Sequence, residues 1–102
     1  MKIYLAGPIT GTDDYMSRFN AVETRLRYAG HKVINPAKKC LILGSDQPHD
    51  VYMKHVLPFL LECDGIYLMD GWENSEGCKL EKSVADACGI PVVEVKILGN
   101  KW

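Results

Sequence analysis

The sequence predicts a three-layer α/β domain with a four- or five-stranded parallel sheet. Short apolar runs of strand length alternate with longer stretches of helical periodicity, in the order β-α-β-α-β-α-β. Such alternation is typical of a parallel sheet with helices on both faces and right-handed crossovers. The chain has 102 residues, the size of one domain with one modest core, so residues 1–102 are expected to form a single domain.

The first third of the chain supplies two strands and one helix. Residues 2–6, KIYLA, form an apolar run of the kind that is buried on both faces of a parallel sheet. Residues 13–29 carry apolar side chains at helical spacing, and Gly30 stands where a C-capping glycine is expected. Residues 31–35, HKVIN, predict a second strand that ends at Pro36, because proline cannot donate to a sheet.

The middle of the chain predicts a loop and a second helix. Residues 37–49 contain Gly, Ser, Asp and Pro without periodicity, which indicates a surface loop or lid. A helix is expected from about residue 51 to residue 62. Pro58 lies inside it and should cause a kink or a fresh start, because an internal proline removes a backbone hydrogen bond.

The last third predicts a third strand over residues 64–70, a third main helix over residues 73–88 and a fourth strand over residues 92–98. The resulting arrangement is of the Rossmann or flavodoxin-like kind, in which ligands bind beyond the carboxyl ends of the strands. The loops expected to form the site are therefore residues 7–13, 35–50 and 70–76.

Composition restricts the partners. The formal net charge is -1 and Lys/Arg runs are absent from the sequence, so any nucleotide partner is expected to be a small molecule rather than a nucleic-acid polymer. No apolar stretch has the length of a membrane span, and a cytoplasmic location without membrane contact is expected. The four cysteines have no C-x-x-C spacing, so we expect reduced, mostly buried thiols, no metal site and no cofactor.

One carboxylate lies within the apolar arc of the helix that starts near Ser75. The arc contains Gly77, Leu80, Glu81, Val84, Ala85 and Cys88, whereas Glu76, Lys79, Lys82, Ser83 and Asp86 fall on the opposite side. A glutamate at the edge of a core can extend to solvent or pair with a lysine. It can also act as a nucleophile or base at the mouth of the sheet. The pattern alone leaves both interpretations of Glu81 open.

Four residues expected near Glu81 could complete a site. Gly77 and Ala85 are small and allow the helix to approach the sheet, which would bring Glu81 toward Tyr4 on the first strand. Tyr4 could orient the carboxylate, or it could be an ordinary buried tyrosine with a backbone partner. Ser75 fits a helix N-cap, and the N–H groups behind it suit an anion such as phosphate.

Further candidates lie in the loops. The segment Gly7-Pro8-Ile9-Thr10-Gly11 follows the first strand and could let the backbone approach a ligand. Trp72 either packs beneath an acidic turn or stacks on a nucleobase. The three histidines, His31, His49 and His55, are scattered, and we expect each of them to be non-catalytic.

Four segments together resemble a known superfamily. They are KIYLAGPITG, GHKVINP, YMKHVLPFLLECDGIYL and GWENSEGCKLEKSVADACGIPV. They are similar to the small phage and bacterial branch of the nucleoside 2-deoxyribosyltransferase-like proteins, a superfamily that also contains 2'-deoxynucleoside 5'-phosphate N-hydrolases. The resemblance covers nearly the whole chain except the predicted lid and the C-terminal tail. It rests on a strand ending Y-x-x-G followed later by a G-x-x-x-E-x-x-x-A helix.

The resemblance implies roles for individual residues. Glu81 matches the nucleophile that attacks the anomeric carbon of the sugar, and Tyr4 matches the tyrosine that positions it. Ser75 matches a serine that contacts the 5'-phosphate in the hydrolase branch. The loop from Gly7 to Gly11 matches the loop that cradles sugar and phosphate. The implied substrate-binding set is Gly7, Pro8, Ile9, Thr10, Gly11, Arg18, Trp72, Ser75 and Gly77.

Two positions depart from the family pattern. The family carries an aspartate on the preceding helix that helps handle the sugar and the leaving base, and this chain has Val56 there. A valine cannot carry a proton. The phosphate loop also lacks the arginine of the hydrolases, which leaves Arg18 as the nearest candidate.

The resemblance implies cleavage or transfer of the N-glycosidic bond of a 2'-deoxynucleoside or its 5'-monophosphate, through a covalent glycosyl-enzyme on Glu81. Val56 supports an alternative, a binding protein that kept the pocket, lost turnover and holds a nucleotide or nucleotide-derived signal. A structural or partner-binding domain is a third hypothesis. A homodimer or larger assembly is expected, because so small a domain gains from burying a helical face against a copy.

Overall fold

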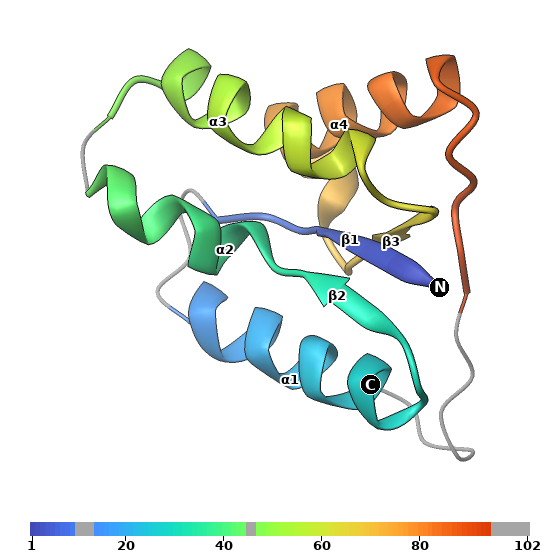
Figure 1. Cartoon of the computed structure of the whole chain (residues 1–102). Coiled ribbons are helices and arrows are strands. Elements are labelled where there is room, and N and C mark those ends of the chain that lie inside the picture. The colour runs from blue at the N-terminus through green and yellow to red at the C-terminus, as the bar shows by residue number, and fades with distance from the viewer. Residues whose placement is uncertain (10–13, 45–46, 95–102) are drawn as a thin grey trace.

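The computed structural model describes residues 1–9, 14–44 and 47–94, and its path is shown in Figure 1. Its elements in order are β1 (Lys2–Ala6), α1 (Tyr15–Tyr28), β2 (Lys32–Ile34), α2 (Pro36–Lys39), the 3-10 helix η1 (Cys40–Leu43), α3 (His49–Leu61), β3 (Gly65–Leu68), the 3-10 helix η2 (Trp72–Asn74) and α4 (Glu76–Ala87). Within these described ranges, no helix is long and apolar enough to cross a bilayer.

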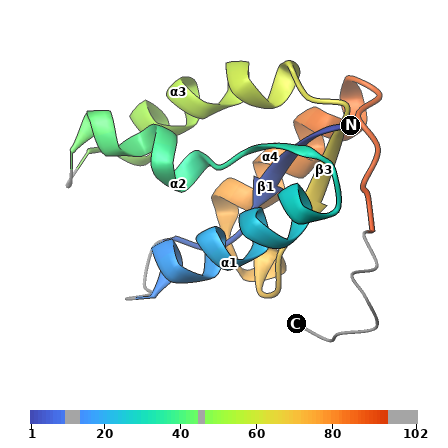
Figure 2. The ribbon, with the colours of Figure 1, turned by 60° about the horizontal axis from the view of Figure 1, so that its bottom comes forward.

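The strands form a parallel sheet in the order β2-β1-β3, with β1 in the centre. Helix α1 covers one face of this sheet, and α3 and α4 cover the other (Figure 1). Turning the molecule shows α1 and α3 on opposite sides of β1 (Figure 2). The prediction of a three-layer α/β domain with a parallel sheet is therefore confirmed.

Strand β1 is buried on both faces of the sheet, which explains why apolar and polar residues do not alternate along it. Tyr4 and Ala6 face the core formed with α3 and α4, whereas Ile3 and Leu5 face the core formed with α1. All four side chains are fully buried. Complete burial of one large apolar side chain stabilises a fold by about 1.5–3 kcal/mol, so β1 anchors both layers.

The expected fourth strand is only partly within the described residues. Val92 forms an isolated parallel bridge with Ile66, and the amide of Val93 donates to the carbonyl of Ile66 at 2.9 Å. The chain thus returns alongside β3 at the edge away from β1. Residues 95–98 of the predicted strand lie outside the described part of the chain. Because the described residues form three strands, a sheet of four or five strands stays a prediction.

The predicted lid is largely helical, which corrects the interpretation of residues 37–49 as a loop. Helix α2 starts at Pro36, and η1 follows it directly. The side-chain oxygen of Asn35 accepts from the amides of Ala37 at 3.0 Å and Lys38 at 3.4 Å, which caps α2. Proline suits the first position of a helix. The sequence Asn-Pro therefore begins a helix here, although it also ends β2.

Helix α3 continues through Pro58 from His49 to Leu61, so a fresh start at this proline, one of the two outcomes expected from the sequence, is wrong. The proline ring conflicts with the carbonyl four residues earlier, which belongs to Lys54. Both Pro58 and Lys54 are exposed. The carbonyl without a helical partner is therefore on the solvent side, where water can satisfy it.

The buried face of α4 is rotated from the predicted arc. Cys78, Glu81 and Ala85 are buried, whereas Leu80 is 42% exposed and Cys88 is exposed. The prediction that Leu80 and Cys88 face the core was therefore wrong, because α4 packs against both the sheet and α3 instead of against the sheet alone. The inward position of Glu81 is confirmed.

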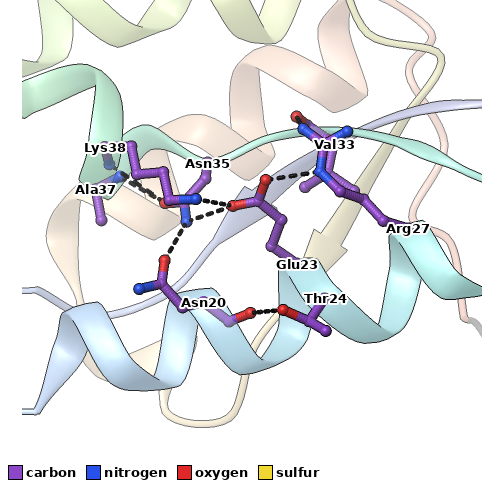
Figure 3. Close-up of polar contacts among 8 residues, drawn as sticks. All are labelled: Asn20, Glu23, Thr24, Arg27, Val33, Asn35, Ala37 and Lys38. Carbon is purple, nitrogen blue, oxygen red and sulfur yellow. Dashed lines mark hydrogen bonds and ion pairs between the residues drawn. The ribbon is translucent and has the colours of Figure 1, made fainter.

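A second buried glutamate organises the opposite side of the molecule (Figure 3). Glu23 on α1 is 7% exposed. Its Oε1 accepts from Asn35 Nδ2 at 3.0 Å and pairs with Lys38 Nζ at 3.0 Å. Its Oε2 pairs with Arg27 Nε at 2.7 Å. Every contact joins α1 to itself or to the start of α2, so Glu23 fixes α2 relative to the sheet. The sequence pattern did not identify this cluster.

Candidate functional site

A cavity of about 600 Å³ opens beyond the carboxyl end of β1. Its lining consists of Gly7, Ile9, Tyr15, Pro36, Ala37, Cys40, Leu41, Gly44, His49, Tyr52, Met53, Val56, Ser75, Gly77, Cys78 and Glu81. The residues come from the segment after β1, from α2 and η1, and from the first turns of α3 and α4. All three loop regions expected from the sequence contribute to it.

Glu81 lines this cavity, whereas its partner Tyr4 lies behind the lining, in the core. The Tyr4 hydroxyl donates a hydrogen bond to Glu81 Oε2. Tyr4 is fully buried, and Glu81 is 6% exposed. The residues are 77 positions apart in the chain, and they meet because α4 packs over the face of the sheet to which Tyr4 points. The structure thus brings together the two residues that the sequence placed in one site.

Burial governs the ionisation of this pair. It raises the pKa of the Glu81 carboxyl to about 7, and the hydrogen bond from Tyr4 opposes part of that rise. Burial also raises the pKa of Tyr4 well above its usual value of 10, and the negative charge of Glu81 adds to this effect. Tyr4 therefore remains a hydrogen-bond donor, while Glu81 exchanges its proton close to neutral pH.

The N-terminus of α4 forms one edge of the cavity. Ser75 Oγ accepts from the amide of Cys78 at 3.3 Å, which confirms Ser75 as the N-cap. Gly77 was expected to bring α4 close to the sheet, but it faces α3 instead. A Cβ at Gly77 would stand 3.2 Å from Cε1 of His49 and 3.4 Å from the sulfur of Met53. The absence of a side chain at Gly77 therefore lets α3, and not the sheet, approach α4 closely.

The described part of the segment after β1 reaches the cavity at two positions. Gly7 and Ile9 line the cavity, whereas Thr10 and Gly11 lie outside the described residues. A Cβ at Gly7 would be 2.8 Å from the sulfur of Met69, so the glycine accommodates the end of β3. Pro8 is not among the residues that line the cavity.

Arg18 and Trp72 also lie outside the cavity lining. Arg18 Nη2 donates to the carbonyl of Pro8 at 3.3 Å, and Arg18 Nε pairs with Asp14 at 3.1 Å. These contacts hold the start of α1 against the segment after β1. Trp72 lies in η2 and packs against the core formed with α3 and α4. The structure thus agrees with the simpler interpretation of Trp72, a side chain packed beneath the turn.

Besides Val56, which the family resemblance had already pointed to, the start of α3 supplies three lining residues that the sequence interpretation did not place in the site. His49, Tyr52, Met53 and Val56 all line the cavity. Their spacing, with intervals of three and four, places them on one face of a helix. The signal was present in the sequence, but residues 37–49 were interpreted as a loop, so His49 was assigned to the loop and not to this face.

Three side chains of α3 have contacts that define their roles near the cavity. The hydroxyl of Tyr52 donates to the carbonyl of Gly44 at 2.8 Å, which ties α3 to the end of η1. Val56 is 4% exposed and offers an apolar wall. His55 points elsewhere, as expected, and its Nε2 lies 2.9 Å from the carbonyl oxygen of Lys39.

Two thiols flank Glu81. Burial raises the pKa of Cys78 to about 11, and burial likewise raises the pKa of Cys40. The negative charge of Glu81 adds to both shifts. At neutral pH these thiols are therefore protonated and act as small apolar groups in the wall. Within the described residues, no group of three or more His, Cys, Asp or Glu side chains is arranged to hold a metal ion.

The chain is similar to one protein family and to one solved structure described below. Residues 1–94 match the family model described as "Domain of unknown function (DUF4406)". A solved structure described as a 2-deoxyribosyltransferase from the psychrotolerant bacterium Bacillus psychrosaccharolyticus superposes with a TM-score of 0.70 at 22% identity, covering 96% of this chain and 78% of that chain. No curated protein sequence matches. The structural likeness establishes a shared fold.

Proposed function

The chain belongs to the DUF4406 family, and we propose that it breaks the N-glycosidic bond of a 2'-deoxynucleoside or its 5'-monophosphate, with Glu81 as the nucleophile. The observation that carries this proposal is a buried carboxylate on the wall of a cavity, held by the hydroxyl of Tyr4. The fold shared with a 2-deoxyribosyltransferase supports the same chemistry, as does the sequence resemblance to its superfamily, including the N-hydrolase branch.

The proposed reaction proceeds in two displacements. A carboxylate oxygen of Glu81 forms a bond to the anomeric carbon as the bond to the base nitrogen breaks. The resulting glycosyl-enzyme is resolved by water, which gives hydrolysis, or by a second base, which gives transfer. A carboxylate beneath the ring stabilises the oxocarbenium-like transition state, as in retaining glycosidases.

The surroundings of Glu81 suit this role. A buried carboxylate is poorly solvated, so less water must leave before its oxygen approaches carbon. The Tyr4 hydroxyl donates a hydrogen bond to Oε2 of Glu81 and thereby restrains the rotation of the carboxylate. Because burial raises the pKa of Glu81 to about 7, the nucleophilic form is present at neutral pH and its fraction grows as the pH rises.

The cavity fits a small nucleoside-like ligand. Its volume of about 600 Å³ falls within the range of small-molecule sites. Apolar groups from α2, η1 and α3, including Ala37, Met53 and Val56, line it together with Glu81 and Ser75. We propose that the base lies against the apolar wall and that the sugar lies toward Glu81.

A nucleotide-binding protein without turnover is the second candidate. Its support is Val56, a buried apolar residue of the cavity wall at the position where the resembled enzymes carry an aspartate. In such a protein the Tyr4 and Glu81 pair would hydrogen-bond the ligand without attacking it.

Base release separates the two candidates. The wild-type protein is incubated with a panel of 2'-deoxynucleosides and their 5'-monophosphates, and free base is followed by chromatography. For an enzyme, Glu81→Ala should abolish release while ligand affinity stays within about tenfold, because the nucleophile acts mainly in the transition state. Glu76→Ala, on the exposed side of the same helix, is the matched control and should retain activity.

Two results would decide against an enzyme with this nucleophile. Release that survives Glu81→Ala contradicts the assignment of Glu81. No release by the wild-type protein, together with thermal stabilisation by a nucleotide, favours the binding protein, because a ligand that prefers the folded state raises its stability.

A further inference from the structure

We propose that His49 is a second catalytic residue of this site, which donates a proton to the nucleobase as it leaves the sugar. This inference rests on the proposed function. It assigns a role to a histidine that faces the same cavity as Glu81, and it supplies the proton donor that Val56 cannot be.

His49 lies where the start of α3 packs against the start of α4. His49 is the first residue of α3, and its ring lies over the first turn of α4, where a Cβ at Gly77 would come within 3.2 Å of His49 Cε1. Gly77 and Glu81 both line the cavity and are separated by about one turn of α4. His49, an exposed residue of the lining, therefore lies against the first turn of α4, about one turn along that helix from Glu81.

This position suits a proton donor to the base. His49 shares one cavity-lining face of α3 with Met53 and Val56, the apolar wall against which the base is proposed to lie. Glu81, the proposed nucleophile, lines the same cavity from α4.

Four other polar side chains of the lining are poorer donors. Cys40 and Cys78 have raised pKa values, so both hold their protons. The hydroxyl of Tyr52 donates to the carbonyl of Gly44, and Ser75 Oγ is the N-cap of α4. Histidine, by contrast, is the side chain that most often serves as a general acid or base in enzymes.

The proton and electron balance is complete. As the glycosidic bond breaks, its electron pair moves to the base nitrogen, which takes the proton from the imidazolium of His49. The base leaves neutral, and Glu81 holds the sugar covalently. Neutral His49 then removes a proton from the attacking water, whose oxygen replaces the Glu81 carboxylate at the anomeric carbon. Both residues return to their starting states.

The test compares leaving groups. His49→Ala is assayed with a 2'-deoxynucleoside that the wild-type protein cleaves and with 7-methyl-2'-deoxyguanosine, whose cationic base leaves neutral without a proton. Loss of a general acid should lower kcat/KM by about 10²–10⁴-fold for the first substrate and by less than about tenfold for the second. Added imidazole should restore part of the activity toward the first. His31→Ala, outside the cavity lining, should leave both unchanged.

Each outcome bears on the proposal. An equal loss on both substrates without rescue by imidazole would make His49 a binding or structural residue and overturn the inference. Unchanged kcat/KM in His49→Ala would overturn it as well, while leaving Glu81 as nucleophile intact. If the wild-type protein releases base from no substrate, the proposed function is wrong, and so is the catalytic role of His49 that rests on it.

Discussion

At the scale of single residues, the environment of a side chain decides what its chemistry can be. Glu81 and Glu23 are both buried glutamates, yet their ionisation differs in direction. Burial alone raises the pKa of both. Glu23 has Arg27, Asn35 and Lys38 around its oxygens, and their hydrogen bonds bring its pKa below the usual value. Glu81 has the neutral hydroxyl of Tyr4, and its pKa rises to about 7. The partners around each carboxylate therefore decide the direction of its pKa shift.

The raised pKa of Glu81 predicts a pH-dependent stability. Because the pKa is about 7 in the folded state and 4.5 in the usual reference, the folded state binds the proton more tightly, and Glu81 destabilises the fold as the pH rises from about 4.5 to about 7. Glu81→Gln removes this cost. Its Tm should exceed that of wild type by a few degrees at pH 8, with a smaller difference at pH 5, as measured by thermal unfolding. Glu76→Gln is the exposed control, and an equal shift at both pH values would contradict the prediction.

At the scale of elements, part of the cavity wall comes from a short helix whose first turn is fixed by a capping side chain. Helix α2 has four residues, too few for stability by propagation alone. It is held because the oxygen of Asn35 caps its amides while the nitrogen of Asn35 binds Glu23. This one side chain connects α1 to the segment that carries Pro36, Ala37 and Cys40 into the cavity.

The cluster around Glu23 predicts a loss of stability in acid. The lowered pKa of Glu23 means that its contribution is fully present above the pKa of the unfolded state and is lost as the pH falls through the folded pKa. Glu23→Gln should lower the Tm at pH 7 and reduce the difference from wild type below about pH 4. Thermal unfolding from pH 3 to pH 7 measures this. Asp14→Asn, at an exposed ion pair on the same helix, is the control. A Glu23→Gln deficit that is constant with pH would refute the role of its charge.

At the scale of the whole molecule, two cores share one central strand. The sheet separates the core of α1 from that of α3 and α4, and the cavity lies at the end of the sheet where the strand order reverses around β1. This is the position where open α/β sheets bind ligands. The short sheet leaves large apolar side chains exposed on several helices, among them Leu61 at 53% and Leu80 at 42%.

This small size predicts self-association. A domain of 102 residues buries a limited share of its surface, and pairing of exposed helical faces such as those of Leu61 and Leu80 would bury more. Light scattering at micromolar concentrations should give the mass of a dimer or a larger assembly. Leu61→Lys with Leu80→Lys tests these particular faces. A wild-type mass equal to that of one chain across a wide concentration range would contradict the prediction.

The sequence by itself determined the features that depend on neighbours along the chain. Local periodicity and capping account for the alternation of the three strands with α1, α3 and α4. They also account for the positive φ of Gly30 after α1, the N-cap at Ser75 and the inward position of Glu81. These signals lie within about one or two turns of helix, so a linear pattern contains them completely.

Only the tertiary structure decided which distant residues meet. The Tyr4 bond to Glu81 spans 77 positions, and the Asn35 bond to Glu23 spans 12. The place of His49 against Gly77 depends on α3 packing on α4, and the continuity of α3 through Pro58 depends on which side faces water. Packing of layers brings side chains from separate elements together, and local patterns leave open which partner each element packs against.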